Sequence, residues 1–225
     1  MRWSNGRATS LAVNGASSLG RLIGLCALIS AGACSSGPPP PDTRPYDQQI
    51  LDGRTLKDAS FRSLAADSPS PLPAAQRASF PGLVYFPIDP DYHVPAALVR
   101  EASQPPRVLE LQTSGPELRR KVEKVGTLGF TIKGTPYKLM AFADEGSLAR
   151  LFVPFADLTA GRETYQGGRY LELDRSSTGL YDLDFNRAYN PFCVYNTSYD
   201  CPIPPRENRL PVAILAGEKL PAGHQ

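Results

Sequence analysis

The segment GRETYQGGRY, residues 161–170, combines two arginines, a glutamate and two tyrosines around a pair of glycines. Arginine presents a planar fork of N–H donors that fits oxygen-rich ligands. Consecutive glycines allow positive φ or the close approach of a partner chain. These residues can clamp an anionic or sugar-like ligand, or they can form an ion-pair network that only fixes the loop. The candidate ligand-binding residues of this segment are Arg162, Glu163, Tyr165, Gly167, Gly168 and Arg169.

A second polar cluster lies in the stretches DFNRAYNP, residues 184–191, and CPIPPRENRLP, residues 201–211. A proline-rich loop of limited freedom can hold asparagine and arginine side chains in a preformed site. The same side chains can instead satisfy buried backbone groups where no regular strand is present. The candidates here are Asp184, Asn186, Arg187, Asn190, Glu207 and Asn208. We expect the ligand site where this cluster meets the glycine-rich segment.

The carboxylates of these clusters are also candidates for hydrolysis. A glycosidase needs two carboxyl groups, about 5 Å or about 6.5–9.5 Å apart depending on its mechanism. Glu163 with Asp184 or Glu207 can supply such a pair. Because a domain of this size contains some such pair by chance, the sequence assigns no catalytic residue.

Four oxygen-bearing side chains, Glu172, Asp182, Asp184 and Asn186, alternate with apolar residues on two predicted strands. The alternation places them on the face opposite the core. Oxygen ligands of this kind can hold a calcium ion. A solvated outer face is the usual arrangement in antiparallel sheets, and it is the interpretation we favour.

Common catalytic and cofactor motifs are missing from the sequence. It has no glycine–serine–glycine nucleophile elbow, no phosphate-binding loop and no paired metal-binding histidines. His93 and His224 are too few to complete a zinc site with Cys193 and Cys201. We therefore expect neither a metal nor a cofactor.

The first 33 residues have the pattern of a secretory signal peptide. Three arginines precede the apolar run LIGLCALISAGA, residues 22–33, which is shorter than the ~20 residues that span a bilayer. Without those arginines the formal net charge of +2 becomes −1. The remaining chain has no long basic run, so a nucleic-acid partner is not expected.

Cys34 stands directly after this segment, where bacterial lipoproteins carry the acylated cysteine. We therefore expect a lipid anchor on Cys34, with the outer membrane, facing the periplasm, as the location. Residues 34–45 form a stiff, proline-rich tether. The alternative is ordinary cleavage after Ala33, which produces a secreted protein.

Cys193 and Cys201 are the two cysteines that remain in the folded domain. An even pair in an exported protein is most simply a disulfide. It closes a short loop and contributes about 2–3 kcal/mol to stability.

The elements that must position these residues are one helix and a series of short strands. The helix is predicted over residues 43–64, with Thr43 as its cap and Gly53 as a weak point. Alternating apolar residues predict strands at 82–88, 92–99, 107–113, 128–132, 137–141, 149–155, 168–174, 180–186 and 209–215. This pattern indicates a mainly β fold, an antiparallel β-sandwich or partly open barrel with one N-terminal helix. A single domain is expected over residues 46–220, with a tail at 221–225.

Four longer motifs carry a family resemblance: FPGLVYFPID, GRETYQGGRYLELD, LDFNRAYNPFCVYN and CPIPPRENRLPVAILAGEK. In this order they resemble the bacterial family known as domain of unknown function 1684, over residues 46–220. The resemblance implies a mostly β fold and an exported, often lipid-anchored form, and it implies no reaction. The matching positions are Gly161 to Tyr170, Asp184 to Asn190, Cys193, Cys201, Pro202, Glu207 and Asn208.

Two functions remain open. The first is a binding or scaffolding module of the cell envelope, with a polar site for a small anionic or glycan ligand. The second is a carboxylate-dependent hydrolase of the envelope. The polar clusters can also be purely architectural, as a brace for a small fold. The protein partner, if there is one, is not indicated.

Overall fold

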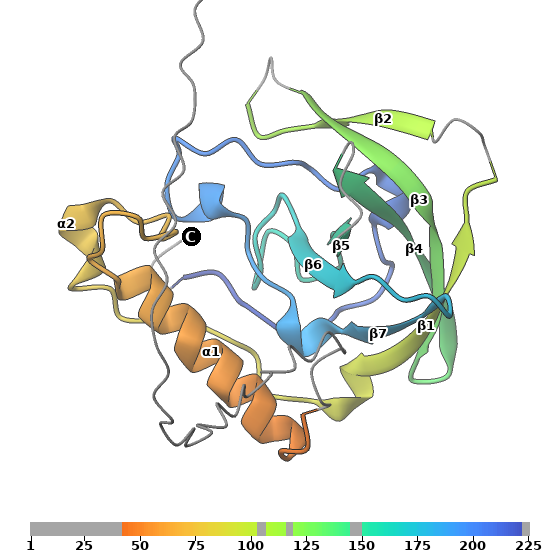
Figure 1. The fold of residues 1–225 in the computed structure, drawn as a ribbon, viewed down its shortest axis with the longest axis horizontal. Helices are drawn as coiled ribbons and strands as arrows, with labels where there is room; N and C mark the ends of the chain where they lie inside the picture. The colour runs from red at the N-terminus through yellow and green to blue at the C-terminus, as the bar shows by residue number, and fades with distance from the viewer. Residues whose placement is uncertain (1–41, 103–106, 116–118, 145–149, 222–225) are drawn as a thin grey trace, which may run out of the picture. The chain divides into compact units, whose positions relative to one another are not determined.

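The computed structural model describes residues 42–102, 107–115, 119–144 and 150–221. Residues 43 onwards form a mainly β unit (Figure 1). The predicted lipidation site and signal peptide lie outside the described residues. The strands are β1 (His93–Arg100), β2 (Arg107–Gln112), β3 (Arg119–Ile132), β4 (Thr135–Asp144), β5 (Arg150–Phe155), β6 (Arg169–Asp174) and β7 (Leu180–Asp184).

The strands form one antiparallel sheet in the order β6-β5-β4-β3-β1-β7, and β2 pairs with the first half of β3. The two end strands, β6 and β7, come close without forming a ladder, so the sheet curls into a nearly closed barrel (Figure 1). The predicted mainly β fold, in its partly open barrel form, is therefore confirmed. The described residues contain seven strands rather than the nine predicted.

The long strand β3 changes its inward face at a bulge between Lys124 and Gly126. Beyond the bulge, Leu128 and Phe130 point into the barrel, whereas Val122 before it packs on the outside. Gly126 is required there, because a Cβ would lie 2.3 Å from the carbonyl oxygen of Val99.

Two apolar clusters lie on the two faces of the sheet. Apolar side chains fill the barrel interior, and they include Leu151, Leu171, Leu183 and Phe185. A smaller cluster of Leu111, Val122 and Phe142 lies outside, with Met140 and Phe152 packed against it. The outer face of the sheet is therefore not uniformly solvated.

Helix α1 (Tyr46–Arg62) lies beside the barrel (Figure 1). It buries Ile50 and Phe61, as its apolar spacing predicts, but Leu64 lies beyond its end and is exposed. The predicted cap at Thr43 is wrong. Pro45 occupies the N-cap position without a side-chain hydrogen bond, so Thr43 is too far back to cap the first turn. A short helix, α2 (Ala74–Arg77), follows.

Two predicted strands are absent from the described sheet. Residues 82–88 run beside residues 217–219, where Tyr85 makes only an isolated bridge to Glu218. Residues 209–215 place Leu210 and Ile214 in the core, but they run as coil. Pro211 has no N–H, and the carbonyl of Ile214 accepts from a buried arginine side chain instead of a strand.

Candidate functional site

Arg169, a predicted ligand-binding residue, is a structural residue in the fold. Its side chain is 1% exposed. The guanidinium donates to Asp157 Oδ2 at 2.7 Å and to the carbonyl oxygens of Ile214 and Glu218 at 3.0 and 3.1 Å. Burial lowers the pKa of Arg169, and the Asp157 carboxylate opposes this effect. These hydrogen bonds connect the C-terminal coil to the barrel. They occupy the guanidinium group, so Arg169 is not placed to bind a ligand.

Asp184 and Asn186 are buried rather than solvated, with exposed fractions of 3% and 1%. The hydroxyl of Tyr46 on α1 contacts both side chains, and Asp184 also caps the 3-10 turn at 185–187 in which the chain leaves β7. Asp184 accepts from Tyr46 Oη at 2.9 Å and from Arg187 Nε at 3.0 Å. Glu172, Asp182 and Asp184 line one cavity, so the alternation is right for these three residues, but the predicted solvated face is wrong for Asp184 and Asn186. No group of three or more candidate metal ligands occurs among the described residues.

Asn190 and Asn208 are fully buried and bond to the backbone. The amide of Asn208 donates to the carbonyls of Met140 and Pro154 and accepts from the Met140 N–H. Asn190 donates to the carbonyl of Lys219 at 2.8 Å. These amides satisfy buried backbone groups between strands and coil. The two asparagines therefore serve the fold, which was the alternative to a ligand site for this cluster.

The glycine pair allows close packing. Gly168 has φ +88°, and a Cβ there would lie 2.5 Å from the carbonyl oxygen of Phe155. A Cβ on Gly167 would meet the ring of Tyr165 at 2.4 Å. The neighbouring Arg162 is exposed and donates to the carbonyl oxygen of Leu158.

The other predicted carboxylates lie apart from this packing. Glu163 and Glu207 are exposed, and neither lines any of the cavities described below.

The glycine-rich segment and the cysteine loop, residues 191–202, do meet. Tyr170 Oη donates to the carbonyl oxygen of Pro202 in this loop, and backbone hydrogen bonds of 2.9 and 3.0 Å join Tyr170 to Tyr189, just before the loop. The Cys193 Sγ lies 3.9 Å from Tyr165 Oη. The predicted convergence of these two segments is present, although most of the predicted polar side chains are occupied within it.

Cys193 and Cys201 are free thiols in this structure. The Cys193 N–H donates to Cys201 Sγ at 3.1 Å, so the two residues are adjacent. Hydrogen bonding to the Cys201 thiol, with a further contribution from Tyr165, lowers the pKa of Cys193 to about 7 against the effect of burial. The disulfide is not formed here and stays a prediction.

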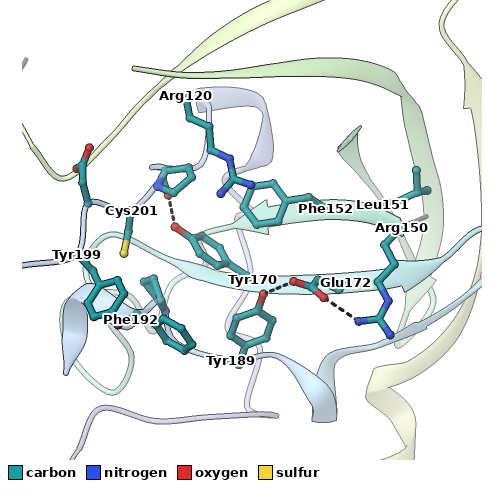
Figure 2. Close-up of a pocket in the computed structure, with 13 residues that line it drawn as sticks. Arg120, Arg150, Leu151, Phe152, Tyr170, Glu172, Tyr189, Phe192, Tyr199 and Cys201 are labelled. Carbon is teal, nitrogen blue, oxygen red and sulfur yellow. Dashed lines mark hydrogen bonds and ion pairs between the residues drawn. The ribbon is translucent and has the colours of Figure 1, made fainter. Parts of the chain in front are cut away.

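A cavity of about 500 Å³ lies where the cysteine loop covers the outer face of β5 and β6 (Figure 2). We call it the aromatic groove. Its size falls in the range of small-molecule sites, about 300–1,000 Å³. The lining side chains that carry chemistry are Arg120, Arg150, Phe152, Tyr170, Glu172, Tyr189, Phe192, Tyr199, Asp200 and Cys201.

The polar side of the groove is a chain of three side chains. Tyr189 Oη donates to Glu172 Oε1 at 2.9 Å, and Arg150 Nη1 donates to Glu172 Oε2 at 3.1 Å (Figure 2). Arg150 also binds Asp174 at 3.0 Å. Burial and the Glu172 charge raise the pKa of Tyr189, so its hydroxyl stays protonated as a donor. Glu172 is thereby oriented and keeps lone pairs for a ligand.

The apolar side of the groove is made of packed rings. Phe152 and Tyr170 meet edge to face at 4.8 Å between centroids, and Phe192 and Tyr199 do so at 5.4 Å. Tyr170 Oη donates to the carbonyl oxygen of Pro202, and burial raises its pKa. Tyr199 is 40% exposed and presents its ring at the surface.

Most of these lining residues are not among the sequence-predicted site residues. The alternation of apolar and polar residues along β5 and β6 places Phe152, Tyr170 and Glu172 opposite the core. This alternation was the sequence feature that could have indicated the groove. It does not show that the cysteine loop folds over this face.

A family model described as a protein of unknown function (DUF1684) matches residues 78–219 of the chain. The chain belongs to this family. The DUF1684 chain is similar to an uncharacterised protein of Haloarcula marismortui, whose structure was determined by solution NMR, with 38% sequence identity and a TM-score of 0.60. The match covers 80% of this chain and 96% of that one. The comparison with curated proteins gives no match.

None of the described helices is both long and apolar enough to cross a membrane.

Proposed function

We propose that this DUF1684 protein is a cell-envelope binding module whose aromatic groove holds a glycan. One observation carries the proposal. A single cavity contains both aromatic rings and the hydrogen-bonded side chains of Tyr189, Glu172 and Arg150. Aromatic rings pack against the C–H faces of sugars, and a carboxylate beside a guanidinium offers acceptors and donors to hydroxyl groups.

The groove favours a hydroxyl-rich ligand over a simple anion. Arg150 already binds two carboxylates, Glu172 and Asp174. Asp200 adds another carboxylate to the lining. With Arg120 and Arg150 the lining charges balance, so an anionic ligand gains no net attraction in the groove, whereas a sugar hydroxyl can donate to a carboxylate and accept from an arginine.

Hydrolysis is the alternative function, and the groove gives it less support. A glycosidase needs one carboxyl group that stays protonated as the acid. Desolvation acts on Asp200, but hydrogen bonds from Thr113 and Gly115 outweigh it and lower its pKa. Glu172 accepts hydrogen bonds from two donors, Tyr189 and Arg150, so each of its carboxylate oxygens already acts as an acceptor. Both carboxylates are thus suited to accept hydrogen bonds from a bound sugar.

The envelope location is part of the same proposal. Its support is the sequence, in which an apolar segment precedes Cys34 and a proline-rich tether follows it. A protein held in this way on a membrane lies among envelope glycans.

The test is isothermal titration of the full-length protein with N-acetylglucosamine, glucose disaccharides and peptidoglycan fragments. Glu172→Gln should weaken the binding of any positive ligand at least about tenfold, since it removes a charged acceptor, about 1.4 kcal/mol. Asp174→Asn is the matched control. Asp174 binds the same arginine but does not line the groove, so this variant should bind within about twofold of the wild type.

Two results would count against the proposal. If none of these glycans binds, or if Asp174→Asn weakens binding as much as Glu172→Gln, the groove is not a glycan site. Release of a shorter sugar, detected by mass spectrometry and lost in Glu172→Gln, would instead establish the hydrolase.

A further inference from the structure

Two smaller cavities adjoin the aromatic groove. The first, about 160 Å³, lies at the open seam between β6 and β7 and is lined by Glu172, Asp184, Arg187 and Tyr189 among others. We call it the seam cavity. The second, about 190 Å³, lies between α1 and residues 186–189 and is called the helix cavity. Each is smaller than a typical small-molecule site.

Shared residues join the three cavities in series. Glu172 lines the groove and the seam cavity, and Arg187 lines the seam cavity and the helix cavity. Tyr189 lines all three. The Tyr189 ring packs against the Tyr170 ring in the groove, with 5.7 Å between centroids. Lys57 Nζ, in the helix cavity, lies 4.5 Å from the centroid of the Tyr189 ring. All three cavities therefore border Tyr189, whose hydroxyl group donates to Glu172.

Each cavity contains a carboxylate with its own cationic partner. The pairs are Glu172 with Arg150 in the groove, Asp184 with Arg187 at the seam and Glu218 with Lys57 at the helix. The three linings together contain five arginine or lysine side chains and five carboxylates, so a chain with a negative charge on every unit gains no net attraction and meets a carboxylate in each cavity. An uncharged chain with hydroxyl groups on every unit finds an acceptor and a donor in each.

The helix cavity also has unused donors. Arg54 donates from Nη1 to the carbonyl oxygen of Phe86 at 3.2 Å, and its guanidinium lies 4.3 Å from the centre of the Tyr85 ring. Its buried Nε and Nη2 have no hydrogen-bond partner among the described residues. Buried N–H groups without acceptors are unfavourable, so an oxygen-bearing ligand next to this edge relieves a cost.

Gly53 lies at the exposed edge of the helix cavity. It lies within α1, where glycine is a poor helix former, and it lines the cavity. A Cβ built on Gly53 would meet nothing within 4 Å, so the fold itself does not require glycine at this position.

We infer that the three cavities form one track, and that its ligand is a linear, uncharged oligosaccharide of several units rather than a single sugar. This inference rests on the proposed glycan-binding function and specifies its ligand. The groove holds one end of the chain, and the seam and helix cavities hold the units that follow.

The experiment measures affinity against ligand length. Oligomers of N-acetylglucosamine and of glucose, from one to six units, are titrated into the full-length protein. Affinity should rise at least about tenfold between two and four units, about 1.4 kcal/mol, and then level off. A uniformly acidic oligomer, oligogalacturonate, should bind more weakly than neutral oligomers of the same length.

Gly53→Leu is the decisive variant, because it fills the helix cavity from the far side of the track. It should reduce the affinity for the longer oligomers to that of the two-unit ligand and leave the two-unit ligand unchanged. Leucine is also a better helix former than glycine, so the melting temperature should not fall. Gly53→Ala adds one methyl group and is the matched control, with nearly wild-type binding.

Different results would contradict the proposed function and the proposed track. If no glycan binds at any length, the proposed function itself is wrong. If short and long oligomers bind equally, or if Gly53→Leu leaves the length dependence intact, the groove binds sugars but the track does not exist. Tighter binding of the acidic oligomer would overturn the uncharged ligand class.

Discussion

At the scale of single residues, polar side chains in this protein divide into those that serve the fold and those that face a cavity. Asn208 and Arg169 are nearly inaccessible, and their donors bind backbone carbonyls. Glu172 is exposed and is oriented by two donors. The sequence predicted Arg169 and Asn208 as ligand-binding residues and Glu172 as part of a solvated face, because residue type does not reveal which acceptors lie nearby.

The two cysteines should differ in reactivity once the protein is reduced. The pKa of Cys193 is lowered to about 7, and hydrogen bonding to Cys193 raises that of Cys201. Because the thiolate is the nucleophile, alkylation of Cys193 should accelerate as pH rises through 7, while Cys201 stays slow. Mass spectrometry after timed iodoacetamide treatment measures both rates.

The unreduced protein is the companion sample. If the predicted disulfide forms, it should take up no label at either cysteine. Equal rates in the reduced protein, with midpoints near the ordinary value of about 8.5, would contradict the asymmetry.

At the scale of elements, α1 is attached to the barrel by both charge and packing. Lys57 pairs with Glu218, which is 1% exposed and also accepts from the N–H of Asn190. Phe61 packs against the rings of Phe192 and Tyr195 in and beside the cysteine loop. The helix thereby supports the back of the loop that covers the groove.

Removing the Glu218 carboxylate should loosen this attachment. Glu218→Gln should lower the free energy of unfolding by about 3 kcal/mol, the lower part of the range for a broken buried pair, because Lys57 is partly exposed. Urea denaturation provides the measurement. The double variant Lys57→Met with Glu218→Gln should recover part of the loss, since no charge is then left without its partner. A loss below about 1 kcal/mol would put this pair with ordinary surface ion pairs.

Strand β3 offers a matched pair of glycines. Gly126→Ala should lower the free energy of unfolding by about 1–3 kcal/mol, because the new Cβ would lie 2.3 Å from the backbone oxygen of Val99. Gly129→Ala on the same strand meets only the oxygen of Ala97 at 3.9 Å and should have little effect. Thermal unfolding of the two variants compares them directly. Equal effects would mean that β1 can move away from the bulge.

At the scale of the whole molecule, the proposed function joins a glycan-binding barrel to a membrane anchor. Cys34→Ala should move the protein from the membrane fraction to the soluble envelope fraction, because the thiol that would carry the lipid is gone. Detergent phase partitioning of both forms is the measurement. Wild-type protein that is already in the soluble fraction would instead indicate ordinary cleavage and secretion.

The sequence alone determined the elements with strong periodicity. The strands predicted at 128–132 and 137–141 form the β3–β4 hairpin, with Lys133 and Gly134 at positive φ in its turn, and α1 buries Ile50 and Phe61. Such features depend on neighbours in the chain, which the sequence displays. The mainly β class follows from the same local signals.

Only the tertiary structure decided which polar residues are buried and where the groove lies. Alternation gave β5 and β6 an outer face, but the cysteine loop that covers this face comes from residues far along the chain. Asp184 is buried because Tyr46 of α1 contacts it, and the coil at 209–215 replaced a strand because the carbonyl of Ile214 accepts from Arg169. Contacts of this kind join segments that are distant in sequence, so local residue patterns do not specify them.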